Sequence, residues 1–144
     1  MKRAGLFDTL GVELDHTFTL LVGTLNHALR EVGVPLNHAQ FVMLKRIAAN
    51  DGISQIALAR SLGKDAAGIS RSLKSLEQYG YVERRPLSGS KNGVFLTDKA
   101  RADQSKIRHA ITLATEKGCR GMTPEEYKAG IEFLLRIQTN LQTS

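Results

Sequence analysis

Arg71 and Lys74 carry the side chains best suited to specific recognition in this chain of 144 residues. They stand three residues apart in a segment with helical apolar spacing, so both would lie on the polar face of one helix. An arginine guanidinium can hold both acceptors on the edge of a guanine, and lysine adds a base or phosphate contact. Ala67, Gly68 and Ser70 are small enough to let that helix approach a partner closely. The segment therefore predicts a helix that reads a nucleic-acid groove.

Further candidate contacts flank this helix on both sides. Ser54 and Gln55 start the preceding predicted helix, where they could donate to a phosphate together with free backbone N–H groups. The remaining candidates are Lys64, Arg84, Arg85, Lys91 and Asn92. Because successive residues of a strand point to opposite faces, we expect only one of Arg84 and Arg85 to reach a phosphate. The other is expected to pair with an acid.

Positive charge is concentrated in the middle of the sequence. From Lys45 to Arg108 there are 13 basic and 6 acidic residues, whereas the two ends together carry 7 basic and 8 acidic ones. The middle therefore supplies the whole of the net charge of +6. Such a distribution favours a polyanionic partner, although a solvated basic surface is the alternative on charge alone.

The apolar periodicity predicts six helices and one β-hairpin around these residues. The first helix runs from about 7 to 32 and ends at Gly33, and the later helices begin at polar caps. Those caps are Asn37, Ser54, Asp65, Thr97 and Thr123. The hairpin strands are expected at 81–85 and 93–96, with a mobile Gly/Ser-rich tip at 86–92.

The first predicted helix is long for a small domain, and both it and the last helix carry an apolar stripe. On the first helix the stripe comprises Leu10, Leu14, Phe18, Leu21, Leu25, Leu29 and Val32. On the last it comprises Tyr127, Ile131, Leu134, Leu135 and Leu141. At about 1.5 Å per residue the first helix would extend close to 40 Å. We expect such a helix to bury part of its face against something outside its own core.

The stretch from about Leu36 to Arg101 resembles the MarR family of bacterial transcriptional regulators. The matching segments are ISQIALARSLG at 53–63, SRSLKSLE at 70–77, GYVERRP at 80–86 and LT at 96–97. The resemblance implies a mainly α fold, a winged helix-turn-helix with a small β-hairpin wing flanked by N- and C-terminal dimerisation helices. The implied parts are an N-terminal dimerisation helix at 1–35, a DNA-binding domain at 36–97 and C-terminal dimerisation helices at 98–144.

The same resemblance implies a partner and a mode of action. It implies a homodimer that binds a pseudo-palindromic operator in double-stranded DNA, acts as a repressor, and frequently takes a small ligand between its two parts. Because the sequence has neither an apolar span nor an apolar signal core, we expect a cytoplasmic protein. The wing departs from the family pattern, because its tip at 87–92 lacks the usual aspartate and arginine. Lys91 is its one cation, and lysine lacks the planar fork of arginine. We therefore expect weaker reading of the minor groove.

Several other functions find no support in the sequence. It has no metalloprotease, nucleophile-elbow or phosphate-loop motif, so we expect no enzyme and no cofactor beyond an unidentified small effector. His16 and His27 would lie roughly 16 Å apart on one helix, too far to share a metal ion. The four histidines are expected to be buried or capping residues. No apolar run reaches the length of a membrane span.

The single cysteine leaves one alternative open. Cys119 lies beside Lys117 and Arg120, and such cations could lower the pKa of a thiol and make it redox-sensitive. The sequence favours an unreactive surface or interface thiol. A second alternative concerns the whole protein: with its shortened wing, the winged helix could serve as a protein-interaction module. The basic centre argues against that function, because interaction patches are poor in lysine.

Overall fold

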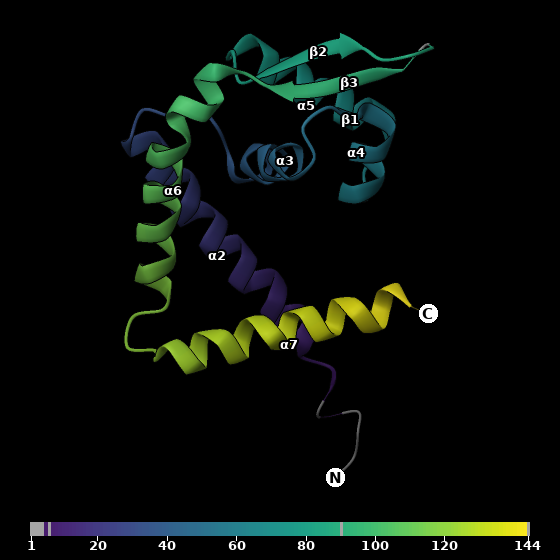
Figure 1. Ribbon diagram of the computed structural model, residues 1–144. Coiled ribbons are helices and arrows are strands. Elements are labelled where there is room, and N and C mark those ends of the chain that lie inside the picture. The colour runs from purple at the N-terminus through teal and green to yellow at the C-terminus, as the bar shows by residue number, and fades with distance from the viewer. Residues whose placement is uncertain (1–4, 6, 90, 144) are drawn as a thin grey trace.

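Three long helices form the frame of the computed structural model, which describes residues 5, 7–89 and 91–143 (Figure 1). They are α2 (Leu10–Glu31), α6 (Asp98–Gly118) and α7 (Pro124–Gln142). α2 packs along α6, and α7 leaves the end of α6 at a sharp angle. The N-terminal residues 1–4 of the predicted dimerisation segment lie outside the described residues.

The remaining elements form a second, more compact group beside this frame (Figure 1). It contains α3 (His38–Ala49), β1 (Ile53–Ser54), α4 (Gln55–Leu62), α5 (Ala66–Gln78), β2 (Val82–Pro86) and β3 (Asn92–Leu96). The strands form an antiparallel sheet in the order β1-β3-β2. The predicted mainly α winged helix-turn-helix fold is confirmed.

The strand β1 is the element that the sequence did not indicate. Ile53 and Ser54 were expected only to lead into and cap a helix, yet they pair with Val94 and Gly93 of β3. A two-residue strand has no periodicity of its own, and its partners lie about 40 residues further along the chain. The two longer strands agree with the prediction to within one residue at each end.

All five predicted caps are confirmed by side-chain hydrogen bonds to the first turn of their helices. Asn37 and Gln40 form a reciprocal capping box at α3, as Thr123 and Glu126 do at α7. Gly80 follows α5 with a φ of 79°, a left-handed conformation that side chains disfavour. Local chemistry therefore fixes where these helices begin and end.

The core lies between α3, α4, α5 and the sheet, and it reaches α6. Its largest fully buried side chains are Tyr81, Leu29, Ile47, Leu58, Ile69, Leu73 and Leu76. The Tyr81 hydroxyl donates to Asp103 of α6 at 2.7 Å, and burial together with this carboxylate raises the pKa of Tyr81. Thr97 caps α6 and also donates to the Gly80 carbonyl at 2.5 Å. These contacts fix the hairpin and α5 against α6.

The frame helices leave much apolar surface uncovered in a single chain. Of the α2 stripe only Leu25 and Leu29 are buried, and Phe18 remains 58% exposed. Within the described residues α7 has no buried side chain at all, and Leu135 is 52% exposed. Exposed apolar side chains that repeat along two helices are the kind of surface that a partner covers.

The histidines do not form a metal site in the part of the chain that the structure describes. His38 lies between the rings of Phe18 and Phe41, with centroids 6.0 Å away on each side, and burial lowers its pKa. The expectation of buried or capping histidines is wrong for His16, His27 and His109, which are exposed on their helices. None of the described helices is long and apolar enough to cross a membrane.

Candidate nucleic-acid interface

Helix α5 presents the face that the sequence singled out. Its apolar residues Ile69, Leu73 and Leu76 are buried, which turns Arg71 and Lys74 outward, and both are exposed. The Asp65 carboxylate caps this helix and accepts from Gly68 N at 2.6 Å. The Asp65 carboxylate, which lies near the exposed cations, is therefore already hydrogen-bonded to the backbone of α5.

Gly68 has a specific packing reason in the first turn of α5. A Cβ at this position would lie 3.0 Å from Oδ1 of Asp65, closer than almost all real Cβ contacts. The guanidinium Nη2 of Arg71 lies 4.0 Å from the same point. Glycine thus leaves room for the Asp65 cap. It also adds no side chain to the first turn of α5 beside Arg71.

Ser54 and Gln55 have partners within the protein at the start of α4. The Ser54 hydroxyl accepts from Ala57 N at 3.1 Å, and Oε1 of Gln55 accepts from Nη1 of Arg84 at 3.3 Å. These bonds use acceptor oxygens, so the Ser54 O–H and the Gln55 N–H groups keep their capacity to donate. A phosphate needs donors, and both residues retain them.

Arg84 is held by neighbouring elements and does not face outward. Its guanidinium forms an ion pair with Glu77 of α5, in which Nε also donates to Oε1 at 2.6 Å, and it reaches Gln55 of α4. The side chains of Arg84 and Glu77 are only 25% and 33% exposed. Arg84 therefore connects β2 to both helices of the helix-turn-helix.

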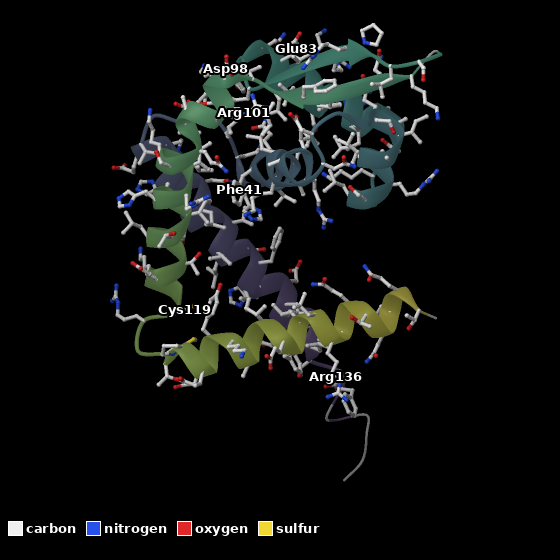
Figure 2. The ribbon with its side chains drawn as sticks, viewed as in Figure 1. Phe41, Glu83, Asp98, Arg101, Cys119 and Arg136 are labelled. Carbon is white, nitrogen blue, oxygen red and sulfur yellow. The ribbon has the colours of Figure 1, made fainter. Side chains whose placement is uncertain are left out.

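Arg85 has the opposite environment on the same strand. Its guanidinium carbon lies 3.7 Å above the Phe95 ring, and its Nε is 3.6 Å from the exposed Glu83 carboxylate. Glu83 lies along the outer edge of the hairpin (Figure 2). The Arg85 side chain is 53% exposed. Stacking on Phe95 restricts the guanidinium without removing it from solvent, which suits contact with a phosphate.

We predict different effects from neutralising these two arginines. Arg84→Gln is expected to lower the free energy of unfolding by about 1–2 kcal/mol, because the half-buried Glu77 carboxylate loses its partner. Arg85→Gln is expected to change stability by less than about 0.5 kcal/mol but to lower the salt dependence of DNA binding by about one phosphate contact. Urea unfolding and binding titrations at several salt concentrations measure both. The assignment is wrong if Arg85→Gln proves the more destabilising change.

The wing carries the last of the predicted contacts. Its turn is closed by Leu87 N donating to the Lys91 carbonyl at 2.7 Å, and both Lys91 and Asn92 are exposed. Of the predicted mobile tip, Ser90 lies outside the described residues. Gly93 is buried, and a Cβ there would lie 3.0 Å from the Gly52 carbonyl. Close approach of β1 to β3 thus requires glycine at this position.

The predicted contacts divide into two groups by exposure. The exposed ones are Lys64, Ala67, Arg71, Lys74, Arg85, Lys91 and Asn92, and the half-buried ones are Ser54, Gln55, Gly68, Ser70 and Arg84. The nearby acids Asp65, Glu77 and Glu83 each have a partner, as a cap or in an ion pair. Among the described residues Arg85 is paired with Glu83, whereas no ion pair involves Lys64, Arg71, Lys74 or Lys91. Most of the exposed cations therefore face solvent uncompensated, an arrangement that can bind a chain of phosphates.

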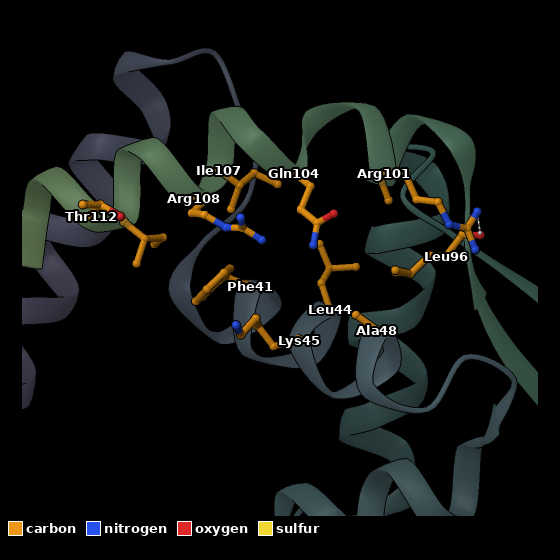
Figure 3. A pocket seen from close by; sticks show the side chains of 12 residues that line it. Phe41, Leu44, Lys45, Ala48, Leu96, Arg101, Gln104, Ile107, Arg108 and Thr112 are labelled. Carbon is orange, nitrogen blue, oxygen red and sulfur yellow. Dashed lines mark hydrogen bonds between the residues drawn. The ribbon is translucent and has the colours of Figure 1, made fainter. Parts of the chain in front are cut away.

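The residues that line a cavity between α3 and α6 were not indicated by the sequence (Figure 3). The cavity is partly open to solvent and has a volume of about 160 Å³. Its lining comprises Phe41, Leu44, Lys45, Ala48, Leu96, Ala100, Arg101, Gln104, Ile107, Arg108, Ile111 and Thr112. The lining residues at 41–48 and those at 96–112 are about 60 positions apart in the sequence. The sequence of α3 and that of α6 each have an ordinary amphipathic pattern. No local pattern could have joined them.

Cys119 lies at the corner between α6 and α7 (Figure 2). It is half-buried and lines an open hollow with Met122 and Tyr127. This corner lies at the opposite end of α6 from α5 and the β2–β3 hairpin (Figure 1).

Comparisons with known proteins agree on the kind of domain. The MarR family model matches residues 36–93, which span α3 to the start of β3. An HTH-type transcriptional regulator of Bacillus subtilis, YybA, is 27% identical over 136 residues, with 82% of this chain and 91% of that protein covered.

Solved structures with the same fold include one bound to DNA and one bound to a small molecule. Reduced AbfR bound to DNA is 20% identical with a TM-score of 0.81, covering 98% of this chain and 95% of that one. CouR from Rhodococcus jostii RHA1 bound to p-coumaroyl-CoA is 21% identical with a TM-score of 0.78, covering 90% and 91%. At such identities the likeness establishes the fold.

Proposed function

The chain belongs to the MarR family of transcriptional regulators through its residues 36–93, and from this premise we propose that it is a homodimeric, ligand-responsive repressor. Members of this family are regulators and not enzymes. The operator would be a pseudo-palindrome in double-stranded DNA. The observation that carries the proposal is α5, whose buried apolar face turns Arg71 and Lys74 outward beside a cationic wing.

In the proposed complex α5 enters the major groove and the β2–β3 wing lies along the backbone. Arg71 contacts a base edge, Lys74 contacts a base or phosphate, and Arg85 and Lys91 contact phosphates. Ser54 and Gln55 donate to a phosphate at the start of α4. AbfR, a neighbour in fold, binds DNA, which supports this mode for the same architecture.

The proposed dimer is joined by the N-terminal segment 1–35 and the C-terminal segment 98–144. It is supported by the uncovered apolar side chains of α2 and α7, including Phe18 and Leu135. A symmetric pair would place two α5 helices on successive half-sites, about one helical turn of DNA apart.

The proposed ligand site is the cavity between α3 and α6. The cavity lies where the frame meets the DNA-binding group, so an occupant there contacts both. CouR, a neighbour in fold, was solved with p-coumaroyl-CoA, which supports a ligand-responsive regulator on this architecture.

Selection from randomised duplex DNA near physiological salt tests the proposal. We expect enrichment of an inverted repeat with half-sites about one helical turn apart. In vitro transcription from a promoter that overlaps the selected site then distinguishes a repressor from an activator. A folded, dimeric protein that enriches no sequence would contradict the proposal and favour a protein-interaction module.

Lys91 provides a separate test of the wing. Lys91→Ala is expected to weaken binding to operator and random DNA alike, because a phosphate contact carries no sequence information. The slope of log affinity against log salt should fall by about one unit. Lys117→Ala, which removes an equal charge from the last turn of α6, is the matched control. An unchanged slope in Lys91→Ala would mean that the wing tip does not touch DNA.

A further inference from the structure

The outward side of α5 carries one straight row of side chains. Ala67, Arg71, Lys74 and Gln78 follow one another at spacings of four, three and four, which places them along one side of the helix. All four are exposed, and the buried apolar residues of α5 lie on the opposite side. Ala67 is the member of this row nearest the start of the helix, and its methyl group is the apolar side chain of the row.

The Arg71 side chain lies back along the helix toward Ala67. Nη2 of its guanidinium is 4.0 Å from the point that a Cβ on Gly68 would occupy. Gly68 stands three residues before Arg71, in the first turn of α5, and is the chain neighbour of Ala67. The charged group of Arg71 therefore lies over the same turn of the helix that carries the Ala67 methyl group.

The charged groups at this turn differ in whether they are already held. Oδ1 of Asp65 accepts from Gly68 N at 2.6 Å, so this carboxylate is held by the helix backbone. Arg71 forms no ion pair within the part of the chain that the structure describes. Its guanidinium is thus available to an outside acceptor, directly beside an exposed methyl group.

A guanidinium beside a small apolar group matches two neighbouring bases in the major groove. Guanine offers the acceptors N7 and O6, which a guanidinium can hold together, and thymine presents a methyl group that alanine can contact. Successive base pairs are about 3.4 Å apart along the duplex, and one helical turn rises about 5.4 Å. Two groups on one turn can therefore contact adjacent base pairs.

We infer that Ala67 is a specificity-determining residue, which contacts the methyl group of a thymine in the base pair next to the guanine that Arg71 holds. The inference rests on the proposed DNA-binding function and adds what each half-site contains, a G·C pair and a T·A pair side by side. Gly68 contributes by leaving the first turn free of a side chain that would stand between these two groups and the bases.

Deoxyuridine tests this contact without any change in the protein, because it pairs as thymine does and lacks only the methyl group. One thymine at a time is replaced in both half-sites of the selected operator, and fluorescence anisotropy measures the affinity of the full-length dimer. Arg71→Ala identifies the guanine through the relaxed preference. At the adjacent thymine we expect a loss of about fourfold per half-site, or about 15-fold for both, as burial of one methyl group provides. Thymines elsewhere should change the affinity by less than about twofold.

Two alanine variants connect the effect to one side chain. Ala67→Gly is expected to bind the thymine and deoxyuridine operators equally, because the methyl group has lost its contact. Ala66→Gly is the matched control, since it makes the same change at an exposed residue of the same turn, about 100° around the helix from Ala67. It should keep the full preference for thymine. Circular dichroism compares the helix content of the two variants.

Three results would overturn the inference. They are a selected half-site without a thymine next to the guanine that Arg71 reads, no effect of deoxyuridine at that thymine, and equal loss of the thymine preference in Ala67→Gly and Ala66→Gly. Any of them, together with enrichment of an inverted repeat, contradicts this inference alone. Absence of any enriched sequence contradicts the proposed function itself.

Discussion

Leu135→Asp is expected to convert the protein from a dimer to a monomer of 15.8 kDa and to weaken operator binding by about 10²-fold or more. Leu135 is 52% exposed in the single chain, on a helix with no buried described side chain. An aspartate there costs the isolated chain little, but in a dimer interface it buries an unpaired charge. The loss of affinity follows because two linked α5 helices bind two half-sites, and one alone does not.

Sedimentation equilibrium measures the mass, circular dichroism measures the helix content, and fluorescence anisotropy with labelled operator measures the affinity. Leu135→Met is the matched control, since it keeps the volume and apolar character of the side chain. It should remain dimeric and bind normally. If Leu135→Asp kept the mass of a dimer and bound DNA normally, α7 would not form the dimer interface.

Arg71→Ala is expected to cost about 1–3 kcal/mol of operator binding and to relax the sequence preference at one position of each half-site. Arg71 is exposed on α5 while Ile69 and Leu73 on either side of it are buried, so the substitution should leave the fold intact. The proposed bidentate contact to guanine is lost, and alanine makes no substitute for it. Random DNA should be bound almost as before, apart from any phosphate contact.

Competition binding with a set of operators that carry single base changes measures the preference directly. Arg120→Ala, beyond the end of α6, removes an equal charge away from α5 and should not alter the preference. An unchanged pattern in Arg71→Ala would show that this side chain does not read bases. A uniform loss on every sequence would assign it to a phosphate instead.

The local structure of this chain could be predicted because its signals are local. Asp65 caps α5 through a bond that spans three residues, and Thr97 and Thr123 do the same for their helices. The buried residues Ile69, Leu73 and Leu76 follow from helical spacing alone. The prediction failed at β1, since Ile53 and Ser54 become a strand only because β3 passes beside them.

Apolar periodicity and capping residues were enough to predict the helices, their caps, the hairpin and the outward face of α5 with Arg71 and Lys74. The sequence also indicated that Arg84 and Arg85 would point to opposite faces of their strand. Both have an acidic neighbour, and the packing of the elements makes Arg84 the half-buried one. The partners of Arg84, Glu77 and Gln55, lie 7 and 29 residues away on two other elements. Strand alternation separates the two arginines without indicating which face meets those helices, and the packing of β2 against α5 fixes that choice. The cavity likewise depends on tertiary packing, because α3 and α6 form it only once the core has brought them together.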